Sequence, residues 1–115
     1  MSTADPGSEA PLQIDVEELA RWQQEHAPHT VVDVREPWEV EICRIAGSID
    51  VPLGELPERL DEVPRDRPVI MLCHHGVRSL KATLWLRNQG LDQAINLAGG
   101  IDAWARRIDR AMPVY

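Results

Sequence analysis

Apolar residues along the chain form two patterns, compact runs and stretches with a helical period. The compact runs are rich in β-branched side chains and predict strands at residues 30–34, 48–51, 68–72 and 94–97. Between them, apolar residues three or four positions apart predict helices: one after Asp15 that ends before Pro28, short ones at 38–43 and up to residue 60, one that ends at Gly90, and a last one at 101–108. Strands that alternate with helices predict an α/β fold, a small parallel β-sheet flanked by helices on both faces.

The clearest predicted strand runs from residue 68 to residue 72. It is apolar throughout and has a proline only at its first position, which suits a central strand covered on both faces. In open parallel sheets, ligands bind beyond the carboxyl ends of the strands. Cys73 stands at that end of this strand, so its position makes it a candidate for the functional site.

Length and composition restrict the organisation further. Residues 1–10 combine small, polar and acidic residues with no apolar period, so we expect a flexible N-terminal tail and a single domain over residues 11–115. A chain of 115 residues can bury one core without help from disulfides or metal. The two cysteines have no CxxC spacing, so we expect neither a disulfide framework nor a metal site, and no cofactor.

The charge balance and the lack of targeting patterns exclude two classes of partner. A formal net charge of −7 opposes binding to nucleic acid and to anionic lipid. The N-terminus shows no basic region followed by an apolar stretch, and no apolar run approaches the ~20 residues of a membrane helix. We therefore expect a soluble, cytoplasmic protein with no nucleic-acid or membrane partner.

The residues after Cys73 form a short loop that opens directly into a helix. Backbone N–H groups in such a loop can converge on one point, and Gly76 gives the loop its conformational freedom. These amides, together with the charge of Arg78, favour a thiolate on Cys73 over the neutral thiol. The same cradle would hold an oxyanion or the negative charge of a persulfide, which is the outline of a sulfur-transfer site. A thiol sealed inside the core would contradict this interpretation.

The other residues of the predicted substrate-binding loop, 74–79, have both functional and structural interpretations. Arg78 stands in the first turn of a helix, where the dipole disfavours a cation unless an anion is near, so we expect it to bind the substrate anion. His74 and His75 either tune the thiolate and contact substrate or are simply exposed to solvent. Val77 and Ser79 complete the loop, Ser79 by capping it or hydrogen-bonding to it.

Cys43 has a simpler explanation than Cys73. It ends a short amphipathic helix beside Ile42 and is followed by no glycine-rich loop. A cysteine in such a position packs in the core as a small apolar side chain, so we assign it no role in the chemistry.

Four segments, in order along the chain, resemble the rhodanese family. CHHGVRS resembles the family's active-site loop, DVREPWE its segment after an early strand, IAGSIDVPLGEL the next strand and helix, and NLAGGIDAW the last strand and turn. The likeness runs from about Ile14 to the C-terminus. The sequence departs from the family at Arg44, where the family often has a histidine.

The resemblance implies an α/β fold, a persulfide intermediate on Cys73, and sulfur taken from a small anion such as thiosulfate. The acceptor that it implies is a thiol, cyanide or a sulfur-accepting protein. It also implies that Asp33 and Arg35 stabilise the rim of the site, since their strand ends on the same edge as that of Cys73. A purely structural ion pair is the alternative for these two residues.

Loop length separates sulfur chemistry from that of related enzymes. Cys73 and Arg78 enclose four residues. The related cysteine phosphatases and arsenate reductases resemble this layout with five, which widens the cradle for a tetrahedral phosphate or arsenate, so the shorter loop favours sulfur. Three alternatives stay open: such a phosphatase or reductase, a persulfide carrier that serves a partner protein, and a non-catalytic rhodanese-like binding module. The intact cysteine argues against the last of these.

Overall fold

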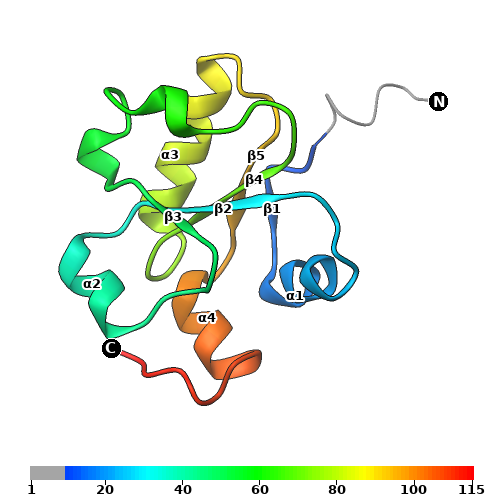
Figure 1. Ribbon diagram of the computed structural model, residues 1–115, viewed down its shortest axis with the longest axis vertical. Helices are drawn as coiled ribbons and strands as arrows, with labels where there is room; N and C mark the ends of the chain where they lie inside the picture. Colours follow the sequence, from blue (N-terminus) through cyan, green and yellow to red (C-terminus); the bar gives the residue numbers. More distant parts are fainter. Residues whose placement is uncertain (1–9) are drawn as a thin grey trace.

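A parallel sheet of five strands runs through the middle of the molecule, in a computed structural model that describes residues 10–115 (Figure 1). The strands are β1 (Gln13–Ile14), β2 (Thr30–Asp33), β3 (Ile49–Asp50), β4 (Val69–Leu72) and β5 (Ala94–Leu97). Their order across the sheet is β1-β5-β4-β2-β3, and each neighbouring pair is parallel. The predicted α/β fold is therefore confirmed, and β4 has the central position predicted for it.

Helices connect the strands and cover both faces of the sheet. They are α1 (Val16–Gln24), α2 (Pro37–Ile42), α3 (Val77–Asn88) and α4 (Gly100–Arg107), with two 3-10 turns, η2 (Leu53–Glu55) and η3 (Leu60–Glu62). On one face α1 packs beside α4, and on the other α3 packs with the segment that contains the two 3-10 turns (Figure 1). The three layers of the predicted architecture are thus present.

β4 shows how the sheet divides the core into two parts. Ile70 and Leu72 pack with the layer of α1 and α4, whereas Val69 and Met71 pack with the layer of α3. All four side chains are buried, because alternate residues of a strand face opposite sides and both sides are covered. Burying each of them contributes about 1.5–3 kcal/mol relative to an exposed side chain. The continuous apolar run in the sequence follows from this central position.

Local signals set the element boundaries. Asp15 caps α1, as predicted, by accepting a hydrogen bond at 2.9 Å from the backbone N–H of Glu18. Pro37 begins α2 one residue earlier than predicted, because its ring already has a helical φ and its missing N–H would be unpaired there anyway. The sequence does not predict β1, since two residues are too few for a periodic signal.

Two other expectations differ from the structure or lie beyond it. The helix expected up to residue 60 is absent within the described chain: η2, a turn and η3 replace it, because Gly54 and Pro57 interrupt the helical pattern. Residues 1–9 of the predicted tail lie outside the described residues, so the domain boundary stays a prediction.

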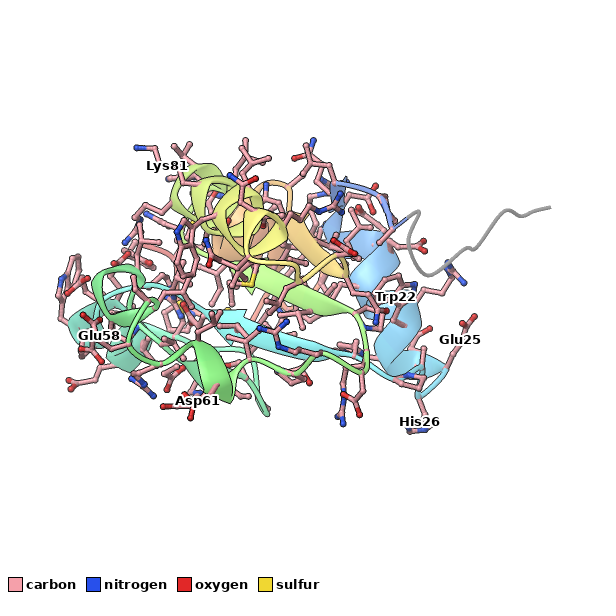
Figure 2. All side chains as sticks on the ribbon, turned by 90° about the horizontal axis from the view of Figure 1, so that it is seen from above. Trp22, Glu25, His26, Glu58, Asp61 and Lys81 are labelled. Atoms are coloured by element: carbon pink, nitrogen blue, oxygen red, sulfur yellow. The ribbon has the colours of Figure 1, made fainter. Side chains whose placement is uncertain are left out.

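Charged side chains cover the outside of the layers. Lys81 projects outward from α3 and Asp61 from η3, and Glu25 and His26 extend from the end of α1 (Figure 2). Glu25 and His26 precede β2, so they lie near the amino ends of the strands, whereas Cys73 follows the carboxyl end of β4. No helix within residues 10–115 is long and apolar enough to cross a membrane.

Candidate active site

Cys73 follows the last residue of β4, at the carboxyl edge of the sheet. In the neighbouring strand, Asp33 pairs in register with Leu72, so two strand ends open on the same edge. The chain turns at Gly76, whose φ of +101° is a left-handed conformation that favours glycine, and enters α3 at Val77. The predicted loop therefore lies between the central strand and the N-terminus of a helix.

The sulfur of Cys73 lies inside this loop and accepts hydrogen bonds from its backbone. The N–H of Gly76 donates to Sγ at 3.1 Å and the N–H of Ser79 at 3.3 Å, while the hydroxyl oxygen of Ser79 lies 3.2 Å from Sγ. Amide donors stabilise a negative sulfur more than a neutral one, and the dipole of α3 acts in the same direction. The convergence of loop amides expected from the sequence is present, with Sγ at the meeting point.

The sulfur is more deeply buried than the sequence leads one to expect of a reactive thiol. Cys73 is 1% exposed and packs against the apolar layer between β4 and α3. An inert core cysteine would share this burial, but its sulfur would have no set of polar contacts. Burial of this kind is the condition that counts against a reactive thiol, and the polar contacts of Sγ are what distinguish Cys73 from an inert core cysteine.

The N-terminus of α4 holds the outer side of the loop. The N–H of Ile101 donates to the carbonyl of Cys73 at 2.9 Å, and the N–H of Asp102 donates to the carbonyl of His74 at 3.0 Å. The first N–H groups of a helix have no partner within it, and here the loop carbonyls satisfy them. Gly100, with φ of +60°, permits this close approach, because a Cβ there would lie 2.5 Å from the carbonyl oxygen of Cys73.

Arg78, expected to bind the substrate anion, binds Glu39 of α2 instead. Both Nη atoms of its guanidinium donate to the carboxylate, at 2.7 and 2.8 Å. A cation in the first turn of a helix needs an anion nearby, and the protein itself provides one. The side chain of Arg78 is 35% exposed, so it lies partly in solvent.

Glu39 accepts four hydrogen bonds. Besides the two from Arg78, it accepts one from the backbone N–H of Glu36 at 3.1 Å and one from the hydroxyl of Tyr115 at 2.8 Å. The hydrogen bonds from Arg78 are the main reason that the pKa of Glu39 falls to about 2, although burial opposes the change. Glu39 is therefore ionised at neutral pH.

Tyr115 brings the C-terminal residues, whose placement the sequence left open, onto the site. Its ring stacks on that of His74, with centroids 3.8 Å apart and planes 5° apart. Burial is the main reason that the pKa of Tyr115 rises to about 12; the hydrogen bond to Glu39 acts in the same direction and the one from Arg35 opposes it. The hydroxyl therefore keeps its proton and can donate it to Glu39.

Asp33 and Arg35 form a buried ion pair behind the loop. Nη2 of Arg35 lies 2.7 Å from the carboxylate of Asp33, and neither side chain is exposed. Arg35 also donates to the backbone carbonyls of Glu39 and Cys43 and to the hydroxyl of Tyr115. Burial alone would lower the pKa of Arg35, but the hydrogen bonds to Asp33 and Tyr115 outweigh it and raise the pKa above its ordinary value. This geometry corresponds to the structural alternative for the pair.

The two loop histidines have different surroundings. His74 lies between the rings of His75 and Tyr115, and its buried Nε2 has no hydrogen-bond partner among the described residues. His75 is exposed, with Nδ1 3.9 Å from the carboxylate of Asp102. Ligand atoms of His74, His75 and Asp102 lie within 4.8 Å of one another, but both oxygens of Asp102 already accept from Arg106. Because the carboxylate of Asp102 is engaged in this way, we assign no metal to this cluster.

Three further residues lie outside the contacts of the sulfur. The side chain of Val77 is 66% exposed, so Val77 belongs to the loop by its backbone. Cys43 is buried in the layer of α1 and α4, in agreement with its predicted packing role. Arg44, where the family often has a histidine, pairs with Asp50 on the surface and donates to the carbonyl of Ser48.

Glu39, Asn96 and Tyr115 are site residues that the sequence does not reveal as such. Asn96 offers one signal, because a polar side chain inside a buried strand requires partners: it accepts from Ser79 and donates to the carbonyl of Gly76. Glu39 lies in the DVREPWE segment, but neither it nor Tyr115 can be paired from local patterns, since their partners stand 39 and 76 residues away along the chain.

Comparison with known proteins identifies the family. The family model described as Rhodanese-like domain matches residues 15–107. A protein of Allochromatium vinosum named sulfurtransferase is 37% identical over 94 residues, which cover 82% of this chain and 88% of that protein. MoeZ of Mycobacterium tuberculosis, named a probable adenylyltransferase/sulfurtransferase, is 35% identical over 100 residues that cover 85% of this chain but 26% of that protein.

A solved structure gives the same result in three dimensions. The crystal structure of a rhodanese-related protein from Thermoplasma volcanium matches with a TM-score of 0.76 and 34% identity, over 91% of this chain and 98% of that one. The family model covers most of the chain, and the proteins from Allochromatium vinosum and Thermoplasma volcanium, both above 30% identity, match along 88% and 98% of their own length. The chain therefore belongs to the rhodanese-like family, which includes named sulfurtransferases.

Proposed function

We propose that the protein carries a transferable sulfur as a persulfide on Cys73 and moves it from a donor such as thiosulfate to cyanide or a thiol. The observation that carries the proposal is the position of Sγ, which accepts from two backbone N–H groups at 3.1 and 3.3 Å where a helix begins. Thiolate is the nucleophile in sulfur transfer, and preorganised donors of this kind stabilise it.

With thiosulfate and cyanide, both half-reactions conserve charge without a proton. In the first, the Cys73 thiolate attacks the outer sulfur of thiosulfate, the S–S bond of thiosulfate breaks, and sulfite leaves with the electron pair. In the second, cyanide bonds to the terminal sulfur of the persulfide, thiocyanate forms, and Cys73 leaves as thiolate. The negative charge thus moves from Sγ to the terminal sulfur and back again.

The charge at the loop favours an anionic donor, and the length of the loop favours sulfur over phosphate. The hydrogen bonds with Glu39 raise the pKa of Arg78 above its ordinary value, so this partly exposed side chain stays charged at the first turn of α3. Only residues 74–77 separate Cys73 from Arg78, and this short loop supports sulfur rather than the wider tetrahedral anions. The family of the chain supports the same choice.

Mass spectrometry after incubation with thiosulfate tests the persulfide. We expect one added sulfur on Cys73, its removal by cyanide, and loss of both adduct and turnover in Cys73→Ser. Cys43→Ser is the matched control, because Cys43 is the other buried cysteine and should leave the adduct unchanged. The proposal would be overturned if no adduct formed or if turnover survived Cys73→Ser. It would also be overturned if the protein hydrolysed an aryl phosphate faster than it used thiosulfate.

A persulfide carrier that receives sulfur from a partner protein is a second candidate. The burial of Cys73 favours it, because a closed site shields a persulfide from small nucleophiles. The likeness to MoeZ, a longer protein whose name combines an adenylyltransferase with a sulfurtransferase, also favours it. A screen of donors and acceptors separates the two: fast exchange with a protein persulfide but slow use of thiosulfate supports the carrier.

A further inference from the structure

Asn96 has an amide whose orientation the structure determines. Its side chain is buried in β5 and makes hydrogen bonds at both ends. The carbonyl of Gly76, 3.2 Å away, can only accept, so Nδ2 of Asn96 must face it. Oδ1 of Asn96 therefore faces the hydroxyl of Ser79, 2.5 Å away.

This orientation decides where the single hydroxyl proton of Ser79 lies. Oδ1 of Asn96 has no proton to donate, so at 2.5 Å the proton on the Ser79 oxygen must point to Asn96. The Ser79 oxygen then presents a lone pair to Sγ of Cys73, 3.2 Å away. A lone pair accepts from the S–H of a thiol but repels a thiolate.

A thiolate on Cys73 would draw the Ser79 proton toward itself. The hydroxyl would have to rotate away from Asn96, which would leave Oδ1 buried without a donor. A buried acceptor without a partner is unfavourable. The two backbone N–H groups at Sγ favour the negative sulfur, while Asn96 opposes it through Ser79.

We infer that Asn96 is a positioning residue that holds the Ser79 hydroxyl away from sulfur and so favours the states in which Sγ carries no negative charge. One such state is the protonated thiol. The other, which rests on the proposed function, is the persulfide, where the terminal sulfur carries the charge. Asn96 thereby sets how readily Cys73 gives up its proton and how firmly it keeps a bound sulfur.

Titration of the Cys73 thiol tests the first half. The ultraviolet absorbance of the thiolate is followed against pH in the Cys43→Ser background, where Cys73 is the only thiol, with Cys73→Ser as the blank. We expect Asn96→Ala to move the midpoint of the titration down by roughly half a unit to one unit, the equivalent of one hydrogen bond. Asn96→Asp keeps an acceptor for Ser79 and should leave the midpoint at or above its original value.

A double-mutant cycle separates this role from a general effect on the loop. If Asn96 acts through the hydroxyl of Ser79, then Asn96→Ala should produce no shift once Ser79 is alanine. Gln13→Ala, which removes the other partner of Nδ2, is the matched control and should leave the midpoint unchanged. Equal shifts with and without the Ser79 hydroxyl, or midpoints that move the same way in Asn96→Ala and Asn96→Asp, would overturn the inference.

Discharge of the persulfide by cyanide tests the second half. We expect loaded Asn96→Ala to release thiocyanate roughly three- to tenfold faster than the unsubstituted chain, because the departing thiolate gains the Ser79 hydrogen bond. Discharge at an equal or slower rate would overturn this half. If thiosulfate loads no sulfur, the proposed function fails, but the thiol titration still decides the role of Asn96.

Discussion

Glu39 uses the full hydrogen-bonding capacity of a carboxylate at the rim of the sulfur loop. An ionised carboxyl group offers about four lone pairs, and Glu39 accepts two bonds from Arg78, one from Tyr115 and one from the backbone of Glu36. These bonds join the start of α3 to α2 and to the end of the chain. Glu39 thus holds Arg78 in place, whereas the sulfur of Cys73 is bound by the backbone N–H groups of its own loop.

We expect Glu39→Gln to destabilise the protein at neutral pH by about 1–3 kcal/mol, because charge-assisted hydrogen bonds in a buried setting are lost. The pKa of Glu39 lies near 2 in the folded protein and near 4.5 as the ordinary value. Its contribution is therefore fully present above about pH 4.5 and is lost as the pH falls toward 2. Urea unfolding at about pH 7 and about pH 3 measures the free energy of unfolding of Glu39→Gln and of the unsubstituted protein. The difference between the two should be smaller at the lower pH.

The control for this prediction is an exposed carboxylate. Glu62→Gln removes a surface partner of Arg59 and should change stability little at either pH, because solvent screens such pairs. The assigned role of Glu39 would be contradicted if the difference in unfolding free energy between Glu39→Gln and the unsubstituted chain stayed constant down to about pH 3.

Arg78 shows what can and cannot be predicted from sequence at this scale. Its place in a first helical turn correctly predicts a nearby anion. The identity of that anion depends on Glu39, which stands 39 residues away and is invisible to local patterns. The chemistry of Cys73 is easier to predict, because the loop amides around its sulfur come from residues within six positions of it.

At the scale of elements, the contact between the sulfur loop and α4 decides the shape of the site. Two backbone N–H groups at the start of α4 bind the carbonyls of Cys73 and His74. The approach is so close that a Cβ at Gly100 would meet both carbonyl oxygens. A helix far along the chain therefore fixes which way the loop peptides point.

We expect Gly100→Ala to cost about 3 kcal/mol or more and to lower sulfur transfer, because the added methyl group pushes α4 away from the loop. Gly90→Ala is the matched control: Gly90 also has a positive φ, +91°, but no atom lies within 4 Å of the position that an added methyl group would take there. It should cost only the backbone strain of about 1–2 kcal/mol and leave turnover unchanged. Thermal or urea unfolding and a thiosulfate assay measure both; equal turnover in the two variants would contradict the role given to Gly100.

The elements differ in how well sequence predicts them. Both faces of β4 and of β5 are covered, so every position in them is buried and nearly all are apolar. This continuous apolar run is the signal that predicts the two strands from sequence. β1 escapes prediction because it gains its structure from pairing with β5, not from its own two residues. The segment around η2 shows the opposite case: its apolar residues have a helical period, but glycine and proline limit it to 3-10 turns.

At the scale of the whole molecule, Arg35 joins parts that are distant along the chain. It binds Asp33 at the end of β2, the backbone around α2 and the hydroxyl of Tyr115. Its side chain is completely buried, so each hydrogen bond replaces one that water would make in the unfolded chain. Arg35 is therefore the point at which the central sheet, the rim of the site and the C-terminal residues are held together.

We expect Arg35→Met to destabilise the protein by about 3–5 kcal/mol, because it leaves the carboxylate of Asp33 buried and unpaired. The double variant Asp33→Asn, Arg35→Met should recover part of the lost stability, since it removes the unpaired negative charge of Asp33. Arg44→Met is the matched control: its pair with Asp50 is 44% and 38% exposed, so its loss should cost less than about 1 kcal/mol. Urea unfolding at neutral pH measures all three. If Arg35→Met cost no more than Arg44→Met, the buried pair would not hold these parts of the molecule together.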